Sequence, residues 1–122
     1  MIKRPLHPRF SQAVLEERKF TTIREKPWPI GTPIMLFNWA GKAYRSKQIN
    51  IAAVIASGFW TIHIEHRTDG TLHYTHGMVN KQPLYQTEGF ESQADMDDWF
   101  RQLVPPGHTI TQNLMRFRLH KN

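Results

Sequence analysis

The stretch ERKFTTIREKPWP, residues 17–29, places four cations around a short β-branched segment and then ends in Pro-Trp-Pro. Arg18, Lys19, Arg24 and Lys26 repel one another, and no acidic run of matching size lies beside them. A strand that is buried on both faces would not carry such side chains. We therefore expect either a solvated edge or a site that holds a negatively charged ligand.

The residues before this stretch have the pattern of a short helix. Over roughly 9–17, the residues Phe10, Ala13, Val14 and Glu17 stand at helical spacing. The chain should then turn, because the FTTIR segment that follows is rich in β-branched and aromatic residues, which favour an extended conformation.

Strand periodicity arranges the polar side chains of this extended segment. Thr22 and Arg24 lie on the same face of a strand, where a hydroxyl and a guanidinium can contact one ligand. Lys19 has the opposite parity. It can join the other two only from the turn before the strand, which the end of the helix permits.

Two β segments are expected next. PIMLFNWAGKAYR predicts two strands joined by a two-residue hairpin at Ala40-Gly41, with Trp39 opposite Lys42 and Phe37 opposite Tyr44. The apolar segment INIAAVIASGFWTIHIEH predicts a further strand with a bulge at its Ser-Gly pair, residues 57–58. A helix is the alternative for its Ala-rich part.

Histidines flank the following turn. If Asp69-Gly70 is a two-residue turn, His66 pairs with His73 and His63 pairs with His76, on opposite faces of the ribbon. Two imidazoles on one face are too few for a closed tetrahedral metal site. We therefore expect partly exposed hairpin histidines and neither a metal ion nor another cofactor.

The clearest helix follows Ser92, which is expected to cap it, and carries an apolar stripe of Met96, Trp99, Phe100 and Leu103. Pro-Pro-Gly at 105–107 ends it. The last segment alternates apolar and basic residues, which predicts a strand with one buried face. Together the elements predict an α+β fold, a small mixed barrel or a curled sheet closed by two helices.

Length and composition bound the possibilities. The chain of 122 residues is expected to form one domain, 1–122. The absence of cysteine excludes a disulfide partner and a Cys-based zinc site. The start MIKRPLHPRF lacks the apolar stretch of a signal peptide, and no run approaches a membrane span, so we expect a cytoplasmic protein without a membrane partner. The sequence does not indicate the oligomeric state.

The net charge of +6 is unevenly distributed. Residues 1–47 carry ten Lys or Arg and three Glu, whereas residues 48–122 carry six Lys or Arg and seven acids. Clustered cations favour a polyanionic partner such as RNA, DNA or a nucleotide phosphate, because binding releases counterions. A basic face that serves solubility is the alternative.

The segment ERKFTTIR resembles the signature of the ASCH-domain family, a branch of the PUA-like superfamily of small β-barrels, in which a Gly-x-Lys is followed by an Arg. Lys19 and Arg24 fall on this pattern, whereas Glu17 replaces the Gly, so a residue with a side chain must build the tight turn. The preceding helix, the PWPIGTPIMLF strand and the EGFESQADMDDWFRQL block also resemble ASCH-like domains. The resemblance covers most of the chain and implies a small mixed PUA-like β-barrel closed by two helices.

The resemblance also implies that the partner is RNA or a modified nucleoside. Domains of this family are regarded as RNA-binding modules, and some members hydrolyse the amide of 4-acetylcytidine or cleave RNA. The amidohydrolase branch continues the signature as Lys-x-x-Thr-x-Arg, which Lys19, Thr22 and Arg24 match. An acid from near the later helix completes the set. The candidates for it are Glu88, Glu91 and Asp95, with Glu88 preferred because it precedes Gly-Phe and does not cap the helix.

These residues have defined roles if the protein is an enzyme. Lys19 would activate Thr22 or a water, the acid would shuttle a proton, and Arg24 would stabilise negative charge. A general base must lose its proton near pH 7, which lowers the pKa of a lysine by roughly three units at a cost of about 4 kcal/mol. A lysine that only binds an anion needs no such change. A non-catalytic RNA-binding module is therefore the alternative, and a protein-interaction platform is a third possibility.

A second group of residues suggests a nucleic-acid surface. Rings and cations interleave in the NWAGKAYRSKQ segment, a composition that suits base stacking and phosphate neutralisation, at Trp39, Lys42, Tyr44, Arg45 and Lys47. Trp28, between two prolines, is a candidate base-stacking wall, and Arg18 and Lys26 would add to the basic surface. The alternative is that the rings belong to the core, with Trp28 as its lid and the lysines solubilising.

Overall fold

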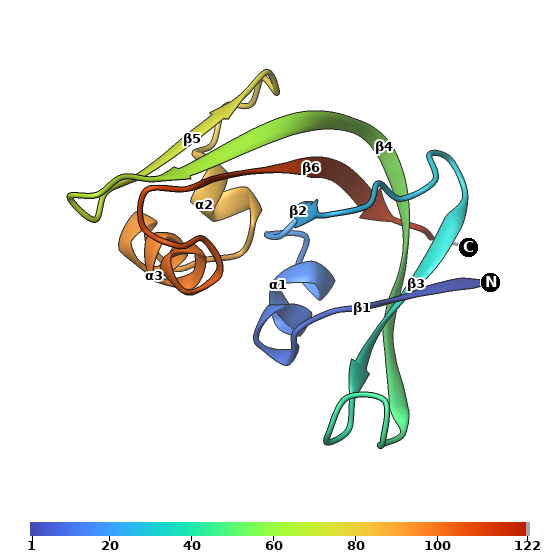
Figure 1. The fold of residues 1–122 in the computed structure, drawn as a ribbon. Coiled ribbons are helices and arrows are strands. Elements are labelled where there is room, and N and C mark those ends of the chain that lie inside the picture. The colour runs from blue at the N-terminus through green and yellow to red at the C-terminus, as the bar shows by residue number, and fades with distance from the viewer. Residues whose placement is uncertain (122) are drawn as a thin grey trace.

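A single six-stranded sheet organises the chain, and the structure, a computed structural model, describes residues 1–121. The elements in chain order are β1 (Ile2–Pro5), η1 (Pro8–Phe10), α1 (Ser11–Leu15), β2 (Thr21–Arg24), β3 (Pro33–Trp39), β4 (Gln48–His66), β5 (Leu72–His76), α2 (Leu84–Thr87), α3 (Gln93–Leu103) and β6 (Thr109–Leu119). Figure 1 shows β4 and β6 arching together, with the three α-helices on the inner side of the curve.

The long strand β4 is the centre of the sheet. It pairs antiparallel with β3 along its first part, with β5 along its last part, and with β6 from residue 54 onward. Its register with β6 shifts between Ala56 and Gly58, which confirms the predicted bulge. The helical alternative for the Ala-rich part of this segment is wrong, because residues 48–66 are one strand.

The sheet is open. The strand order is β1-β3-β4-β6-β2, with β5 beside the far end of β4, so β1 and β2 lie at opposite ends and do not pair with each other within residues 1–121. β1 runs parallel to β3, and β2 runs antiparallel to β6. The predicted α+β class is therefore confirmed, whereas the strands described here do not close into a barrel.

The core lies between the curved sheet and the helices. Its fully buried side chains come from β3, β4, β6, α1 and α3, among them Ile34, Leu36, Ile62, Ile64, Leu114, Met115, Val14 and Met96. Burying each such side chain contributes roughly 1.5–3 kcal/mol. The core therefore holds α1 and α3 against the sheet.

Three local predictions are confirmed with small changes. The helix expected over 9–17 is η1 followed by α1, and it ends at Leu15. The Ser92 side chain caps α3 by accepting a hydrogen bond from the Asp95 backbone N–H. In β6 the alternation holds, with Phe117 buried and its neighbour Arg118 exposed.

One residue of the apolar stripe differs from the prediction. Leu103, which was expected to be buried with the rest of the stripe, is 59% exposed, because it lies in the last turn of α3.

The hairpin predicted at Ala40-Gly41 is wrong. Trp39 pairs with Gln48 rather than with Lys42, and residues 40–47 form a longer loop.

Side-chain hydrogen bonds explain the longer loop. The Ser46 hydroxyl accepts a hydrogen bond from the Gly41 backbone N–H at 3.0 Å and donates one to the Lys42 carbonyl at 2.8 Å. Tyr44 lies in the left-handed region with a φ of 63°, which lets the chain reverse its direction there. The Ala40-Gly41 pair in the sequence indicates neither the hydrogen bonds of Ser46 nor the left-handed conformation of Tyr44.

The predicted histidine pairs are also wrong. Glu65 lies opposite His73 and Ile62 lies opposite His76, one residue away from the expected register. The turn is wider than two residues, because the Asp69 carboxylate accepts hydrogen bonds from both the backbone N–H and the hydroxyl of Thr71. A slip of one residue moves every side chain to the other face.

His66 shows the result of this shift. It is buried, and its Nδ1 lies 2.7 Å from the Val104 carbonyl. The expectation of a partly exposed histidine therefore fails at this position.

Candidate functional site

The tight turn after α1 positions Lys19. Glu17 has a φ of 59°, in the left-handed region that usually favours glycine, so a residue with a side chain builds this turn as the sequence required. The backbone N–H groups of Arg18 and Lys19 both donate to the Ala13 carbonyl, at 2.8 and 3.0 Å. These bonds fold the chain back over the end of α1. Lys19 therefore approaches β2 from the turn before the strand.

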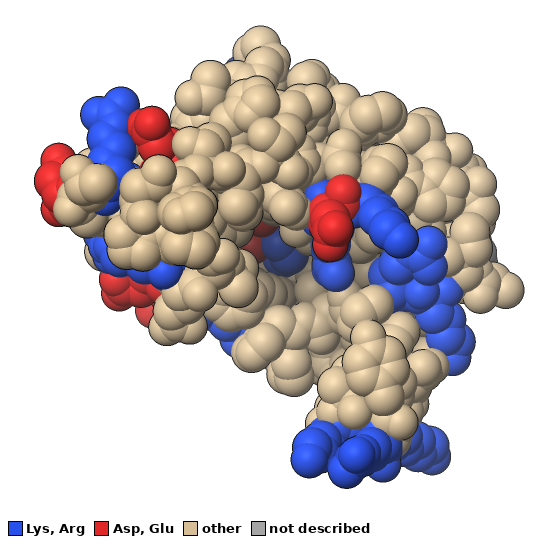
Figure 2. Space-filling model, in the orientation of Figure 1, with Lys and Arg blue, Asp and Glu red and all other residues tan. Residues whose placement is uncertain are grey.

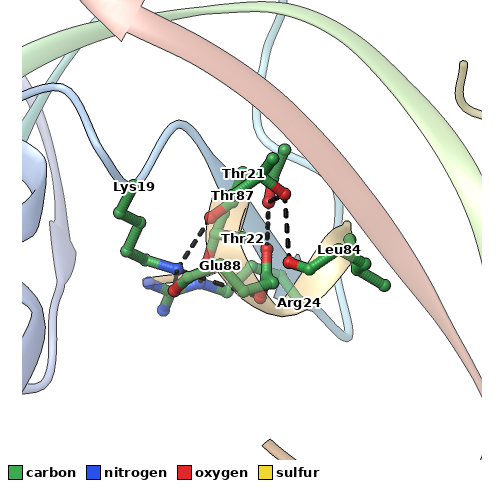
Figure 3. Close-up of polar contacts among 7 residues, drawn as sticks. All are labelled: Lys19, Thr21, Thr22, Arg24, Leu84, Thr87 and Glu88. Atoms are coloured by element: carbon green, nitrogen blue, oxygen red, sulfur yellow. Dashed lines mark hydrogen bonds and ion pairs between the residues drawn. The ribbon is translucent and has the colours of Figure 1, made fainter. Parts of the chain in front are cut away.

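The Lys19 side chain is buried, with 4% of its surface exposed. Its Nζ donates to the Thr21 carbonyl at 2.7 Å and to the Glu88 carbonyl at 2.8 Å, and lies 3.8 Å from Glu88 Oε1 (Figure 3). It also lies 4.7 Å from the centre of the Phe10 ring. A neutral amine keeps two N–H groups, so both carbonyl bonds survive the loss of one proton.

Glu88 lies at the end of α2 and is 3% exposed. The Phe20 backbone N–H donates to the Thr87 carbonyl at 2.9 Å, which joins α2 to the start of β2. The Thr21 hydroxyl forms a short hydrogen bond to Glu88 Oε2, and it lies 2.9 Å from the Thr87 hydroxyl. Glu88 is thus held between Lys19 and the Thr21 hydroxyl.

The other two candidate acids have different surroundings. Asp95 pairs with Arg9 and accepts a hydrogen bond from the Glu91 backbone N–H at 3.1 Å. Glu91 is exposed. Of the three acids, Glu88 is therefore the one that the structure places beside Lys19.

Thr22 and Arg24 lie on one face of β2, as strand periodicity predicted. Arg24 Nε donates to the Thr22 hydroxyl oxygen at 3.0 Å (Figure 3). The guanidinium carbon of Arg24 lies 5.1 Å from the centre of the Trp28 ring, which adds a cation–π contact. Because the Thr22 oxygen accepts from a cation, negative charge on that oxygen is stabilised.

Burial changes the acid–base properties of both cations. Removal from water lowers the pKa of Lys19 to about 8; the negative charge of Glu88 opposes this change and the charge of Arg24 adds to it. Burial also lowers the pKa of Arg24, with Glu88 opposing and Arg4 adding. A guanidinium stays protonated even so. Lys19 is therefore the group that can exchange a proton near neutral pH.

The four residues line one cavity of about 430 Å³. Lys19, Thr22, Arg24 and Glu88 form its polar part together with His7 and Gln112. Figure 2 shows this face of the molecule hollowed near its centre, with acidic and basic atoms together inside the hollow. The structure thus brings together the residues that the sequence singled out as a set.

Aromatic side chains form much of the remaining cavity wall, beside aliphatic ones such as Ile23 and Ile110, and the sequence did not indicate this role. Phe10, Phe90 and Trp99 line it and contact one another edge to face, with ring centres 5.2 to 5.8 Å apart. The guanidinium of Arg9 lies over all three rings at 5.1 to 5.7 Å. Trp99 was interpreted only as part of an apolar helix stripe. A tryptophan on the helix that follows the Glu-Gly-Phe segment is the signal that could have indicated it.

The predicted nucleic-acid residues are dispersed. The loop over 40–47 exposes Lys42, Arg45 and Lys47, and Tyr44 is 87% exposed. Lys and Arg atoms gather at the lowest point of Figure 2, which Figure 1 identifies as the loop between β3 and β4. Trp39 is half-buried and lies 5.3 Å from the Tyr44 ring. This loop lies outside the cavity lining.

Three further residues of that set lie near β2. Arg18 and Lys26 are exposed, and Arg18 forms an ion pair with Glu16 at 2.9 Å. Trp28 is 3% exposed and packs against Phe117, with ring centres 5.9 Å apart. It cannot act as a base-stacking wall, because its ring is enclosed by the core. The alternative, a lid on the core, describes it.

Among residues 1–121, no three His, Cys, Asp or Glu side chains gather in a way that could hold a metal ion. No helix in the same range is long and apolar enough to span a membrane. Comparisons with family models, with curated proteins and with solved structures found no match for the chain.

Proposed function

We propose that this chain is an ASCH-like domain whose open sheet is a variant of the PUA-like barrel, and that it hydrolyses an amide on a modified nucleoside such as acetylated cytidine. One observation carries the proposal. Lys19, a buried amine with a lowered pKa, shares a cavity with the Thr22 hydroxyl, the Arg24 guanidinium and the Glu88 carboxylate. An amine of this kind can act as a general base at mildly alkaline pH.

The hydrogen bonds of Lys19 and Arg24 suit each of these residues to one step of the proposed hydrolysis. Lys19 takes a proton from the Thr22 hydroxyl or from a water, because its two carbonyl bonds need only two N–H groups. The oxygen freed of its proton forms a bond to the amide carbon. Arg24, which already donates to Thr22, stabilises the negative charge. The C–N bond then breaks, and the leaving amine receives a proton that Lys19 or Glu88 carries. Where water is the nucleophile, this step releases the acid directly. Where Thr22 is the nucleophile, Lys19 next takes a proton from a water, which cleaves the acyl–Thr22 ester, releases the acid and returns the proton to Thr22.

The shape of the cavity favours a base over a bare phosphate as its occupant. The half-buried Trp99, beside the buried rings of Phe10 and Phe90, offers apolar ring surface to a planar group, while the polar part addresses the edge of that group. A volume of about 430 Å³ lies in the range of small-molecule sites. Amide hydrolysis on a base is therefore preferred to cleavage of an RNA phosphodiester.

The test is the release of acetate from acetylated cytidine, measured for the wild type and for Thr22→Ala, Lys19→Met and Arg24→Gln. We expect turnover by the wild type and a loss of at least about 100-fold in Lys19→Met, the size of a general-base contribution. Lys26→Met is the matched control, since Lys26 is exposed and lies outside the cavity lining, and it should keep full turnover. Absence of turnover in a folded wild type, with this substrate and with structured RNA, would refute the enzyme.

A non-catalytic RNA-binding module is the second candidate, and the exposed cations of the loop over 40–47 favour it. For that function the loop matters more than Thr22. Loss of turnover in Thr22→Ala with unchanged RNA affinity supports the enzyme. An inactive wild type that binds RNA with a steep dependence on salt supports the module.

A further inference from the structure

A buried chain of oxygen atoms leads away from the Glu88 carboxylate. Glu88 Oε2 contacts the Thr21 hydroxyl, which lies 2.9 Å from the Thr87 hydroxyl, and this in turn donates to the Leu84 carbonyl at 3.1 Å (Figure 3). Thr21 and Thr87 are fully buried. Hydroxyls in such a place keep their hydrogen bonds within the protein, because no water can replace them.

The number of protons in this chain depends on Glu88. Three oxygen-to-oxygen contacts need three protons, and two hydroxyls supply only two. When Glu88 is a carboxylate, Thr21 donates to it and Thr87 donates to Leu84, so the contact between the hydroxyls has no proton of its own. When Glu88 is protonated, it donates to Thr21, Thr21 donates to Thr87, and Thr87 donates to Leu84. All three contacts are then hydrogen bonds.

We propose that Thr21 and Thr87 are positioning residues that support Glu88 in both of its protonation states by reversing the direction of one hydrogen bond. This inference rests on the proposed function, because it explains how Glu88 can take up a proton during turnover and release it again. The proton that Glu88 receives comes from Lys19 or from the leaving group. It returns by the same route, since the Leu84 carbonyl has no proton to pass on.

The charged groups around Glu88 act in the opposite sense. Lys19 Nζ lies 3.8 Å from Oε1, and Arg24 contributes a second positive charge in the same cavity, with Arg4 beyond it. These cations attract the oxygens of the charged carboxylate. A protonated Glu88 therefore needs compensation, and the completed chain of Thr21 and Thr87 supplies it.

The test is the titration of the Glu88 side-chain carboxyl, followed by NMR in the full chain without substrate. Thr87→Val removes the acceptor that Thr21 uses only when Glu88 is protonated, so the titration midpoint of Glu88 should fall by roughly half to one pH unit. Thr21→Val removes the donor to the carboxylate, and because bonds to a charged group are the stronger ones, the midpoint should rise. Thr87→Ser keeps the hydroxyl and should leave the midpoint in place.

Opposite shifts support the inference, and shifts in the same direction or no shift overturn it. Thr61→Val, on the exposed face of β4, is the control for a general effect of replacing threonine by valine. If Thr21→Val does not fold, the contrast between Thr87→Val and Thr87→Ser decides alone. The titration can be measured whether or not the protein is active. If the protein is inactive but the two variants shift the Glu88 midpoint in opposite directions, only the proposed function is refuted. If the protein is active but the midpoints do not shift in opposite directions, only the role of the hydroxyl chain is refuted.

Discussion

The molecule carries two groups of cations whose surroundings differ completely. Lys19 is buried among two carbonyls, a carboxylate and the Phe10 ring, and the half-buried Arg24 contacts a hydroxyl and the Trp28 ring. The loop over 40–47 presents the same residue types to solvent. Burial lowers the pKa of Lys19 to about 8, whereas charges in water act mainly through long-range, salt-dependent attraction. The same side chain therefore suits acid–base chemistry in one place and electrostatic attraction in the other.

The largest expected effect comes from removing the counter-charge inside the cavity. Glu88→Leu leaves Lys19 buried without a carboxylate, so the free energy of unfolding should fall by about 3 kcal/mol at pH 7. Urea denaturation measures it. Glu91→Leu is the control at an exposed acid and should stay within about 0.5 kcal/mol of the wild type. Equal free energies of unfolding for the two variants would mean that the buried Lys19–Glu88 pair contributes no more to stability than an exposed acid does.

The next largest effect is a dependence of the free energy of unfolding on pH, which Lys19 causes. Its pKa is about 8 in the folded protein and near the ordinary 10.5 in the unfolded chain. Between these values the unfolded chain binds more protons, so stability rises with pH. Relative to Lys19→Met, the wild type should gain up to about 3 kcal/mol from pH 8 to pH 10.5. A constant difference between the two proteins across this range contradicts the shifted pKa.

The aromatic wall of the cavity should have a smaller effect, confined to binding. Trp99→Leu keeps an apolar side chain but removes the ring, and nucleoside affinity should fall by roughly 1–3 kcal/mol, the usual contribution of base stacking. Calorimetry measures it. Trp39→Leu removes a ring beside the exposed loop and should leave nucleoside affinity unchanged. Equal losses in both variants would show that the cavity does not hold the base.

The smallest effect on the folded protein is expected from the exposed loop. Replacing Lys42, Arg45 and Lys47 together by Gln should change the free energy of unfolding by less than about 0.5 kcal/mol. If the loop binds single-stranded RNA, the slope of log affinity against log salt should fall by roughly 2, about 0.7 for each phosphate that the variant no longer neutralises. Turnover of a free nucleoside should not change. A loss of turnover in this variant would show that the exposed loop contributes to catalysis, so the loop and the cavity would not be functionally separate.

Local rules predicted the part of the site that lies within residues 19–24, whereas Glu88, which is 69 residues from Lys19, was indicated only by the resemblance to ASCH-like domains. Thr22 and Arg24 share a face through the two-residue period of a strand, and Lys19 comes from the turn before it. The cap of α3 and the bulge of β4 likewise follow from neighbouring residues. Each of these features has its signal in neighbouring residues, and each is present in the structure.

Features that depend on distant or side-chain contacts were not predicted. The two misplaced turns are built by hydrogen bonds of Ser46 and Asp69, which propensities do not register. β1 has two cations and a proline among its four residues, and it is a strand because β3 pairs with it. Trp28 and Trp99 exchanged their expected roles, since only the packing of β2 and α3 decides which ring faces the core and which faces the cavity.

The gap in the sheet between β1 and β2 has a consequence for how a ligand enters. Leu6 and His7, which follow β1, and residues 22–24 of β2 both line the cavity, yet no backbone ladder joins these two walls within residues 1–121. Side-chain packing, rather than hydrogen bonds between strands, holds these two walls together. If the proposed nucleoside ligand is part of an RNA strand, this unpaired seam offers its flanking backbone a way out of the cavity that breaks no hydrogen bond between strands.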